Sequence, residues 1–187
     1  MNAFSECLSI TKYLAFPFKQ IETYNSLAEL QSNYKIAKEY LETGRKICIA
    51  TSLNSLELGK SFYIEAGLLL LEEKYDKAIG CIDHAIEILE QVGYGSGCAK
   101  SYLIKGKILF QSRQYKSAIE YLEKAGKYYI REEIYPTLRL ESFYYILKCA
   151  EEIGQLNQYK KFDDYTYFNE DQFPHLQKYL KEIKCKI

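Results

Sequence analysis

The sequence has no excess of charge of either sign. Lysine plus arginine number 25 and aspartate plus glutamate also number 25, so the formal net charge is zero. A chain without an overall positive field has no general means of attracting nucleic acid or an anionic membrane. We therefore expect neither a nucleic-acid partner nor a membrane partner, and electrostatic recognition must depend on local groups.

Residues suited to metal or redox chemistry are also few. His84 and His175 are the only histidines, and neither lies at ligand spacing from a cysteine. The six cysteines include no Cys-x-x-Cys pair, and no secretory signal precedes them. We therefore predict reduced thiols in a cytoplasmic protein, without a metal or another cofactor.

Catalytic motifs are missing too. The sequence has no Gly-rich phosphate loop, no nucleophile elbow, and no His-x-x-x-His or Glu-x-x-His spacing for a metal. With 48% hydrophobic and 27% charged residues, however, the 187 residues are enough to bury a sizeable core. The composition is neither that of a disordered chain nor that of a membrane-spanning one, and it favours one compact unit.

What the sequence does contain is one apolar pattern that occurs twice, forty residues apart. The first copy is Tyr75, Ala78, Ile82, Ala85 and Leu89, and the second is Tyr115, Ala118, Leu122, Ala125 and Tyr129. Steps of three and four residues place each set on one face of an α-helix. The alanines let a neighbouring helix approach closely while the larger side chains fill the gaps. Stacked helix hairpins need this arrangement.

The pattern resembles that of the tetratricopeptide repeat (TPR) family, which builds solenoids from helix hairpins. The signature positions hold Phe62, Ala66, Leu69, Tyr75, Ala78, Ile82 and Ala85, and again Tyr102, Gly106, Leu109, Tyr115, Ala118, Leu122 and Ala125. The departures are Glu65 and Lys105, where the family usually has an aliphatic residue, and a period near 40 instead of about 34. The resemblance implies an all-α, right-handed superhelical solenoid of TPR-like antiparallel helix hairpins with a C-terminal capping helix.

Applied along the chain, the pattern predicts a single TPR-like domain over residues 1–187. It comprises a helix at 4–15, repeats at about 18–58, 59–98, 99–138 and 139–169, and a C-terminal amphipathic helix at 171–184. Within the first three repeats the expected helices are 18–30, 34–50, 56–73, 75–91, 97–112 and 115–131. The opening helix is either a cap or the second helix of a repeat that lies upstream. In the first repeat Asn25 stands where a small residue belongs, which predicts looser packing against the next hairpin.

In the TPR family the first helix of each hairpin lines the concave groove. Carried over by position, this implies the candidate ligand-binding residues Lys60, Tyr63, Lys100, Leu103, Lys107, Phe110, Tyr144 and Lys148. Apolar anchors surrounded by lysines suit a short peptide with hydrophobic side chains and an acidic group or free carboxylate. Two plainer interpretations stay open: exposed lysines are usually only solvated, and Leu103 and Phe110 could pack beneath long helices.

A period near 40 is also similar, more weakly, to the TPR domains of the Gram-positive bacterial peptide-sensing regulators called the RRNPP group. That similarity covers about residues 18–168 and implies a peptide-pheromone-responsive regulatory domain, truncated or acting in trans. We predict a non-catalytic scaffold that binds a protein or short peptide through the concave groove. The alternatives are that regulatory domain, and a response-regulator phosphatase or enzyme accessory subunit. A homodimer is a further open alternative.

Overall fold

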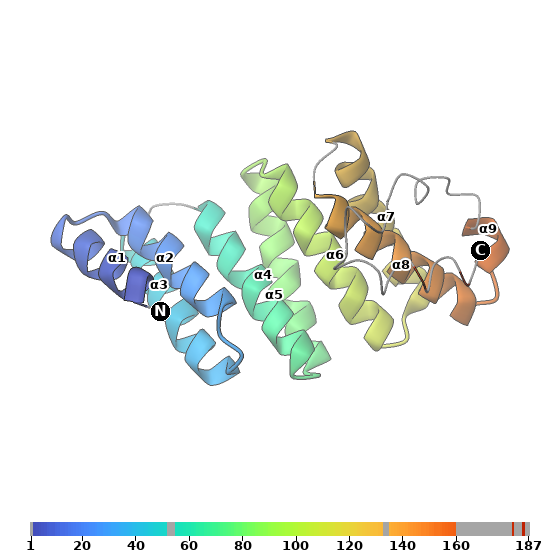
Figure 1. The fold of residues 1–187 in the computed structure, drawn as a ribbon, viewed down its shortest axis with the longest axis horizontal. Coiled ribbons are helices and arrows are strands. Elements are labelled where there is room, and N and C mark those ends of the chain that lie inside the picture. The colour runs from blue at the N-terminus through green and yellow to red at the C-terminus, as the bar shows by residue number, and fades with distance from the viewer. Residues whose placement is uncertain (1, 52–54, 133–134, 160–180, 182–184, 186–187) are drawn as a thin grey trace. The chain divides into compact units, whose positions relative to one another are not determined.

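The computed structural model describes residues 2–51, 55–132, 135–159, 181 and 185, and Figure 1 shows how the helices follow one another. The helices are α1 (Asn2–Tyr13), α2 (Pro17–Glu29), α3 (Tyr34–Thr51), α4 (Ser55–Leu71), α5 (Tyr75–Gln91), α6 (Gly95–Gln111), α7 (Tyr115–Arg131), α8 (Pro136–Glu152) and α9 (Leu156–Tyr159). No residue in this part of the chain forms a β-strand. The predicted all-α fold of antiparallel helix hairpins is therefore confirmed. The predicted helix at 171–184 lies, apart from residue 181, outside the described residues.

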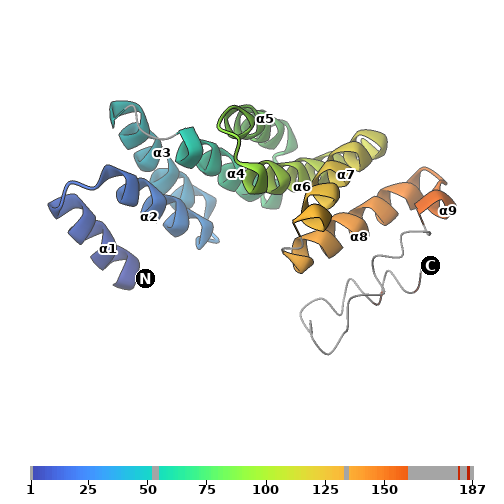
Figure 2. The same ribbon diagram turned by 90° about the horizontal axis from the view of Figure 1, so that it is seen from above.

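The chain forms two compact units, Met1–Ser101 and Tyr102–Ile187, and the boundary between them falls inside α6. In the first unit α1 packs against α2, and Figure 2 shows these two helices side by side. The next hairpins are α2 with α3 and α4 with α5, and α4 also contacts both helices of the hairpin before it. In the second unit α8 packs against α7 and α9. The organisation of the whole chain as one repeat domain stays a prediction.

Four of the five positions in each copy of the repeated apolar pattern lie in the core, and the first position, Tyr75 or Tyr115, is half-buried. In α5 the side chains of Ala78, Ile82, Ala85 and Leu89 are all completely buried. In α7 the equivalent residues Ala118, Leu122, Ala125 and Tyr129 are buried to the same degree. The five helices α4 to α8 have 17 residues each, which accommodates the period near 40.

The same turn follows α4, α6 and α8. Its central residue has a left-handed backbone and is Glu73 (φ 57°), Arg113 (φ 60°) or Gly154 (φ 70°). After α4 the Lys74 N–H donates to the Leu69 carbonyl oxygen at 2.9 Å, which is the long bond of a Schellman motif. The equivalent bonds run from Gln114 to Leu109 at 2.9 Å and from Gln155 to Ala150 at 2.8 Å. Three hairpins are thus closed by one turn geometry, so the sequence repeat is also a structural repeat.

The start of α6 differs from the prediction. The helix begins at Gly95, two residues before the predicted start at 97. Gly93, with φ of 67°, alone makes the left-handed turn after α5. Gly95 and Gly97 are therefore helical, and of the three glycines only Gly93 lies in the connection between α5 and α6.

Gly106 marks a close approach between α6 and α7 in the second unit. A Cβ atom on Gly106 would lie 2.5 Å from Cγ of Leu122 and 3.3 Å from the Ala118 carbonyl oxygen. Leu122 is completely buried and has little room to move. Replacing Gly106 by alanine should therefore lower the free energy of unfolding by about 1–3 kcal/mol, measured by urea unfolding followed by circular dichroism.

Gly67, in the middle of α4, is the matched control for this substitution. No atom lies within 4 Å of a Cβ built on Gly67. Gly67→Ala should therefore raise the free energy of unfolding by about 0.5–1 kcal/mol, because alanine is the better helix former. Equal stabilisation by the two substitutions would contradict the close packing at Gly106.

Candidate functional site

Three of the predicted site residues, Lys60, Tyr63 and Lys100, lie together in the first unit. Lys60 and Tyr63 are about one turn apart on α4, and Lys100 lies in the first half of α6. The Lys100 ammonium is 4.8 Å from the centroid of the Tyr63 ring and 2.9 Å from Oε1 of Glu29, the last residue of α2. The first helices of three successive hairpins therefore meet at one surface. We call it the Lys60–Lys100 face and define it by Glu29, Glu57, Lys60, Tyr63 and Lys100.

Lys60 is held by a buried carboxylate. Glu57 lies in the first turn of α4 and is 1% exposed, and its Oε1 accepts a hydrogen bond from Lys60 Nζ at 2.7 Å. Burial opposes the charge on Lys60, but the hydrogen bond to Glu57 and the charge of that carboxylate raise the pKa of Lys60 above its usual value. The Lys60 ammonium also lies 5.5 Å from the centroid of the Tyr94 ring. The Lys60 side chain is therefore protonated at neutral pH, and its hydrogen bond to Glu57 fixes its position.

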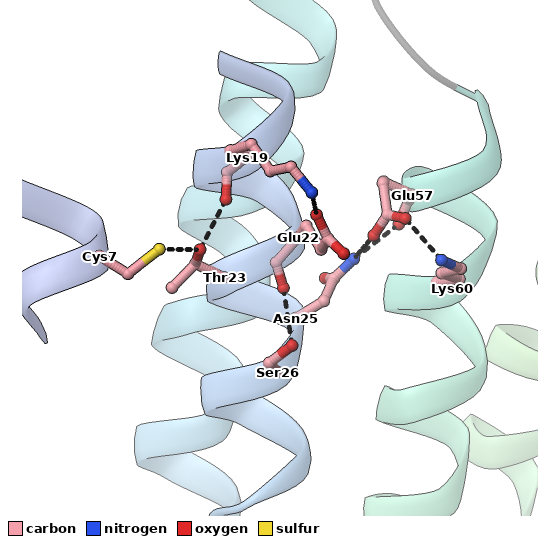
Figure 3. Close-up of polar contacts among 8 residues, drawn as sticks. All are labelled: Cys7, Lys19, Glu22, Thr23, Asn25, Ser26, Glu57 and Lys60. Carbon is pink, nitrogen blue, oxygen red and sulfur yellow. Dashed lines mark hydrogen bonds and ion pairs between the residues drawn. The ribbon is translucent and has the colours of Figure 1, made fainter. Parts of the chain in front are cut away.

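Asn25 links the first two hairpins instead of loosening them. Its Nδ2 donates to Glu57 Oε2 at 2.9 Å and to the Glu57 backbone carbonyl oxygen at 3.0 Å. Figure 3 shows this amide reaching from α2 to α4. The looser packing predicted at Asn25 is therefore wrong, because a buried amide that satisfies a buried carboxylate replaces the expected small residue.

Other polar contacts in Figure 3 tie α2 to α1 and order its exposed side. Cys7 Sγ of α1 lies 3.4 Å from Thr23 Oγ1 of α2. Lys19 Nζ donates to Glu22 Oε2 at 2.7 Å within α2. These contacts hold the helix that carries Glu29 and Asn25.

The Tyr63 ring lies beneath the Lys100 ammonium in the Lys60–Lys100 face. Its side chain is 8% exposed. Burial, reinforced by the charge of Glu29, raises the pKa of Tyr63 above its usual value, so the phenol is protonated at neutral pH. A neutral ring beneath the Lys100 ammonium favours the cation by its quadrupole.

The other predicted site residues are Leu103, Lys107, Phe110, Tyr144 and Lys148, and they belong to the second unit. Lys107 of α6 donates to Glu141 Oε1 of α8 at 2.7 Å. The Lys107 ammonium is also 5.6 Å from the centroid of the Tyr145 ring, and Phe110 packs edge-on against that ring at 5.4 Å. The second unit thus repeats the combination of a lysine, a carboxylate and a tyrosine ring.

The predicted apolar anchors offer little free surface. Leu103 is 3% exposed and Tyr144 is 9% exposed. Phe110 is half-buried, and the Lys148 ammonium lies 5.6 Å from the centroid of the Tyr144 ring. The burial of Leu103 matches the interpretation that it packs beneath a long helix. The accessible part of the predicted site therefore consists mainly of the four lysines and the half-buried Phe110.

The acidic partners of these lysines are the residues that the sequence-based selection missed. Glu29 and Glu141 stand at first-helix positions that the TPR register also assigns to the groove, so the register itself could have found them. Glu57 and Asn25 are 32 residues apart, and their contact depends on how α2 packs against α4. No signal in the sequence reports that contact.

The departure from the TPR pattern at Glu65 has a structural explanation. Arg45 of α3 donates from Nη1 to Glu65 Oε2 at 2.6 Å and from Nε to Ser61 Oγ at 2.8 Å. The guanidinium carbon also lies 4.0 Å from the centroid of the Phe62 ring. Burial, together with the Glu65 carboxylate, raises the pKa of Tyr34 to about 12, and the Tyr34 hydroxyl donates to Glu65 Oε1 at 3.1 Å. A buried ion pair takes the place of the aliphatic contact.

The equivalent departure in the next repeat, Lys105, is compensated differently. Its Nζ donates to the Tyr121 hydroxyl at 2.9 Å and lies 4.1 Å from the centroid of that ring.

Within the described ranges, no group of three or more His, Cys, Asp or Glu residues is placed to hold a metal ion. Among the helices of the same ranges, none is both long and apolar enough to cross a membrane.

Comparisons with known proteins support the helical-repeat fold. The family model for SNAP, soluble NSF attachment protein, matches residues 19–168. The solved structure of BtubC (BKLC) from P. vanneervenii matches with a TM-score of 0.67 at 15% identity, over 97% of this chain and 75% of that chain. At that identity the likeness concerns the fold alone. No curated protein sequence matches the chain. These matches support a TPR-like helical repeat and do not support the weaker resemblance to the RRNPP group.

Proposed function

The chain belongs to the soluble NSF attachment protein (SNAP) family, and we propose that it is a non-catalytic scaffold that binds a protein through the first helices of its hairpins. The family consists of non-catalytic helical scaffolds, and its name describes attachment to another protein. A helix-hairpin repeat forms an extended surface, which is suited to binding another protein rather than to catalysis.

The Lys60–Lys100 face carries the proposal. It combines two ammonium groups, a tyrosine ring beneath one of them, and side chains from α2, α4 and α6. Ammonium groups set over aromatic rings are suited to an acidic side chain or a carboxylate, and the rings are suited to the apolar neighbours of that group. The proposed ligand is therefore an acidic segment of a protein, presented as a short peptide or a helix.

A peptide-display selection against the purified chain tests this proposal. The expected result is a recovered set of sequences that combine acidic and large apolar residues. A selection without any enriched sequence, or with enrichment of basic sequences, would contradict the proposal.

Charge reversal at Lys100, on the Lys60–Lys100 face, should weaken such binding. Lys100→Glu should lower affinity for a selected peptide about five- to tenfold, because an exposed charge pair contributes up to about 1 kcal/mol and reversal adds repulsion. Fluorescence anisotropy with the labelled peptide measures the affinity, and circular dichroism checks the helix content. Lys77→Glu, on the exposed surface of α5, is the matched control and should leave affinity within about twofold. Unchanged affinity in Lys100→Glu would count against the surface.

A further inference from the structure

The two lysines of the Lys60–Lys100 face are held by very different partners. Lys60 is paired with Glu57, whose side chain is 2% exposed and is also bonded by Asn25. Lys100 is paired with Glu29, whose side chain is 55% exposed, and the Lys100 side chain is 36% exposed. If Glu57 separated from Lys60, its buried carboxylate would lose its cation, whereas the exposed Glu29 side chain can rotate into solvent.

The Glu29–Lys100 pair is also weak for an ion pair. Exposed pairs contribute little because water and salt screen both charges and because two long side chains lose freedom. The Lys100 ammonium nevertheless has a second support, since it lies 4.8 Å from the centroid of the buried Tyr63 ring. If Glu29 rotated away, Lys100 would therefore stay over the Tyr63 ring. The N–H that Lys100 donates to Glu29 would then be available to another acceptor.

We infer that Glu29 is a built-in competitor that occupies Lys100 until the carboxylate of an acidic protein segment displaces it. This inference rests on the proposed function and names its regulation. The incoming carboxylate takes the 2.9 Å position of Glu29 Oε1 at Lys100 Nζ, while Lys60 stays bonded to Glu57. Lys100 is thus the exchangeable contact of the face and Lys60 the permanent one.

The pair spans more of the repeat than an ordinary contact does. Glu29 ends the first helix of one hairpin, and Lys100 lies 71 residues later on the first helix of the hairpin after next. Hairpins in a solenoid otherwise touch mainly their immediate neighbours. Exchange of the Glu29 carboxylate for a ligand carboxylate therefore releases a link that bridges the intervening α4–α5 hairpin.

The test uses a fluorescein-labelled deca-glutamate peptide and the full chain, with fluorescence anisotropy as the measurement. Glu29→Gln should raise the affinity about two- to fivefold, because it removes a competing exposed carboxylate. Lys100→Gln should lower the affinity, and Glu29→Gln added to Lys100→Gln should give no gain. Deca-glutamine, which has no carboxylate side chains, should not respond to either change.

Glu22→Gln is the matched control, because it makes the same charge change on the same helix at a residue paired with Lys19. An equal gain in Glu22→Gln, or a gain that persists in the Lys100→Gln background, would overturn the inference as a general charge effect. Wild-type binding that Glu29→Gln leaves unchanged would also overturn it, while leaving the proposed function intact. A chain that binds deca-glutamate in neither form overturns the inference, and the peptide-display selection then decides the proposed function separately.

Discussion

Replacing Ala118 by aspartate should lower the free energy of unfolding by about 3–5 kcal/mol, because it places an unpaired carboxylate in a completely buried position. Ala118 lies on α7 close to Gly106 of α6, since a Cβ on Gly106 would be 3.3 Å from the Ala118 carbonyl oxygen. Leu122, one turn further along α7, is also completely buried, so the new carboxylate would be shielded from water. It must either displace α6 or bind a proton at a cost in stability.

The measurement is thermal and urea unfolding followed by circular dichroism. A loss of this size should lower the melting temperature by about 10 °C, given the entropy of unfolding of a chain of this length. Lys116→Asp, exposed in the first turn of the same helix, is the control and should change stability by less than about 0.5 kcal/mol. An unchanged melting temperature for Ala118→Asp would contradict the repeat register itself.

Replacing Arg45 by methionine should destabilise the first unit by about 3–5 kcal/mol. The substitution removes the cation from Glu65, whose side chain is 8% exposed, and leaves that charge buried. It also removes the hydrogen bond to Ser61 Oγ and the contact with the Phe62 ring. The hydroxyl of Tyr34 remains as a donor to Glu65, but a neutral donor does not replace a guanidinium.

A double variant separates the value of the ion pair from the cost of breaking it. Arg45→Met combined with Glu65→Leu should recover most of the stability lost in Arg45→Met, because an apolar pair needs no desolvation. Urea unfolding of the two single variants and the double variant gives the coupling energy. Additive losses would show that Arg45 and Glu65 do not interact in the folded protein.

The helices could be predicted from the sequence because they depend on local spacing. The steps of three and four residues from Ala78 to Leu89 fix one buried face. Helix ends were less predictable, since Gly95 begins α6 even though glycine is a poor helix former. There the tertiary packing of α6 outweighs the local preference of its first residues.

The partners of the site lysines could not be predicted in the same way. Lys60, Tyr63 and Lys100 follow from the repeat register, whereas the bond from Lys100 to Glu29 joins residues 71 positions apart. Such pairs depend on the rotation of one hairpin against another, which periodicity does not specify. Asn25 shows the same limit, because a polar residue at a small-residue position indicates loose packing until its partner is known.

Lysine acetylation footprinting with and without a selected acidic peptide tests most directly whether the first helices form the binding surface. Lysines on first helices, Lys60, Lys100 and Lys107, are compared by mass spectrometry with Lys77 and Lys116, which are exposed on second helices. Binding as proposed predicts slower acetylation of Lys100 and at least one other first-helix lysine, with Lys77 and Lys116 unchanged. Protection confined to Lys77 and Lys116 would contradict the proposed surface.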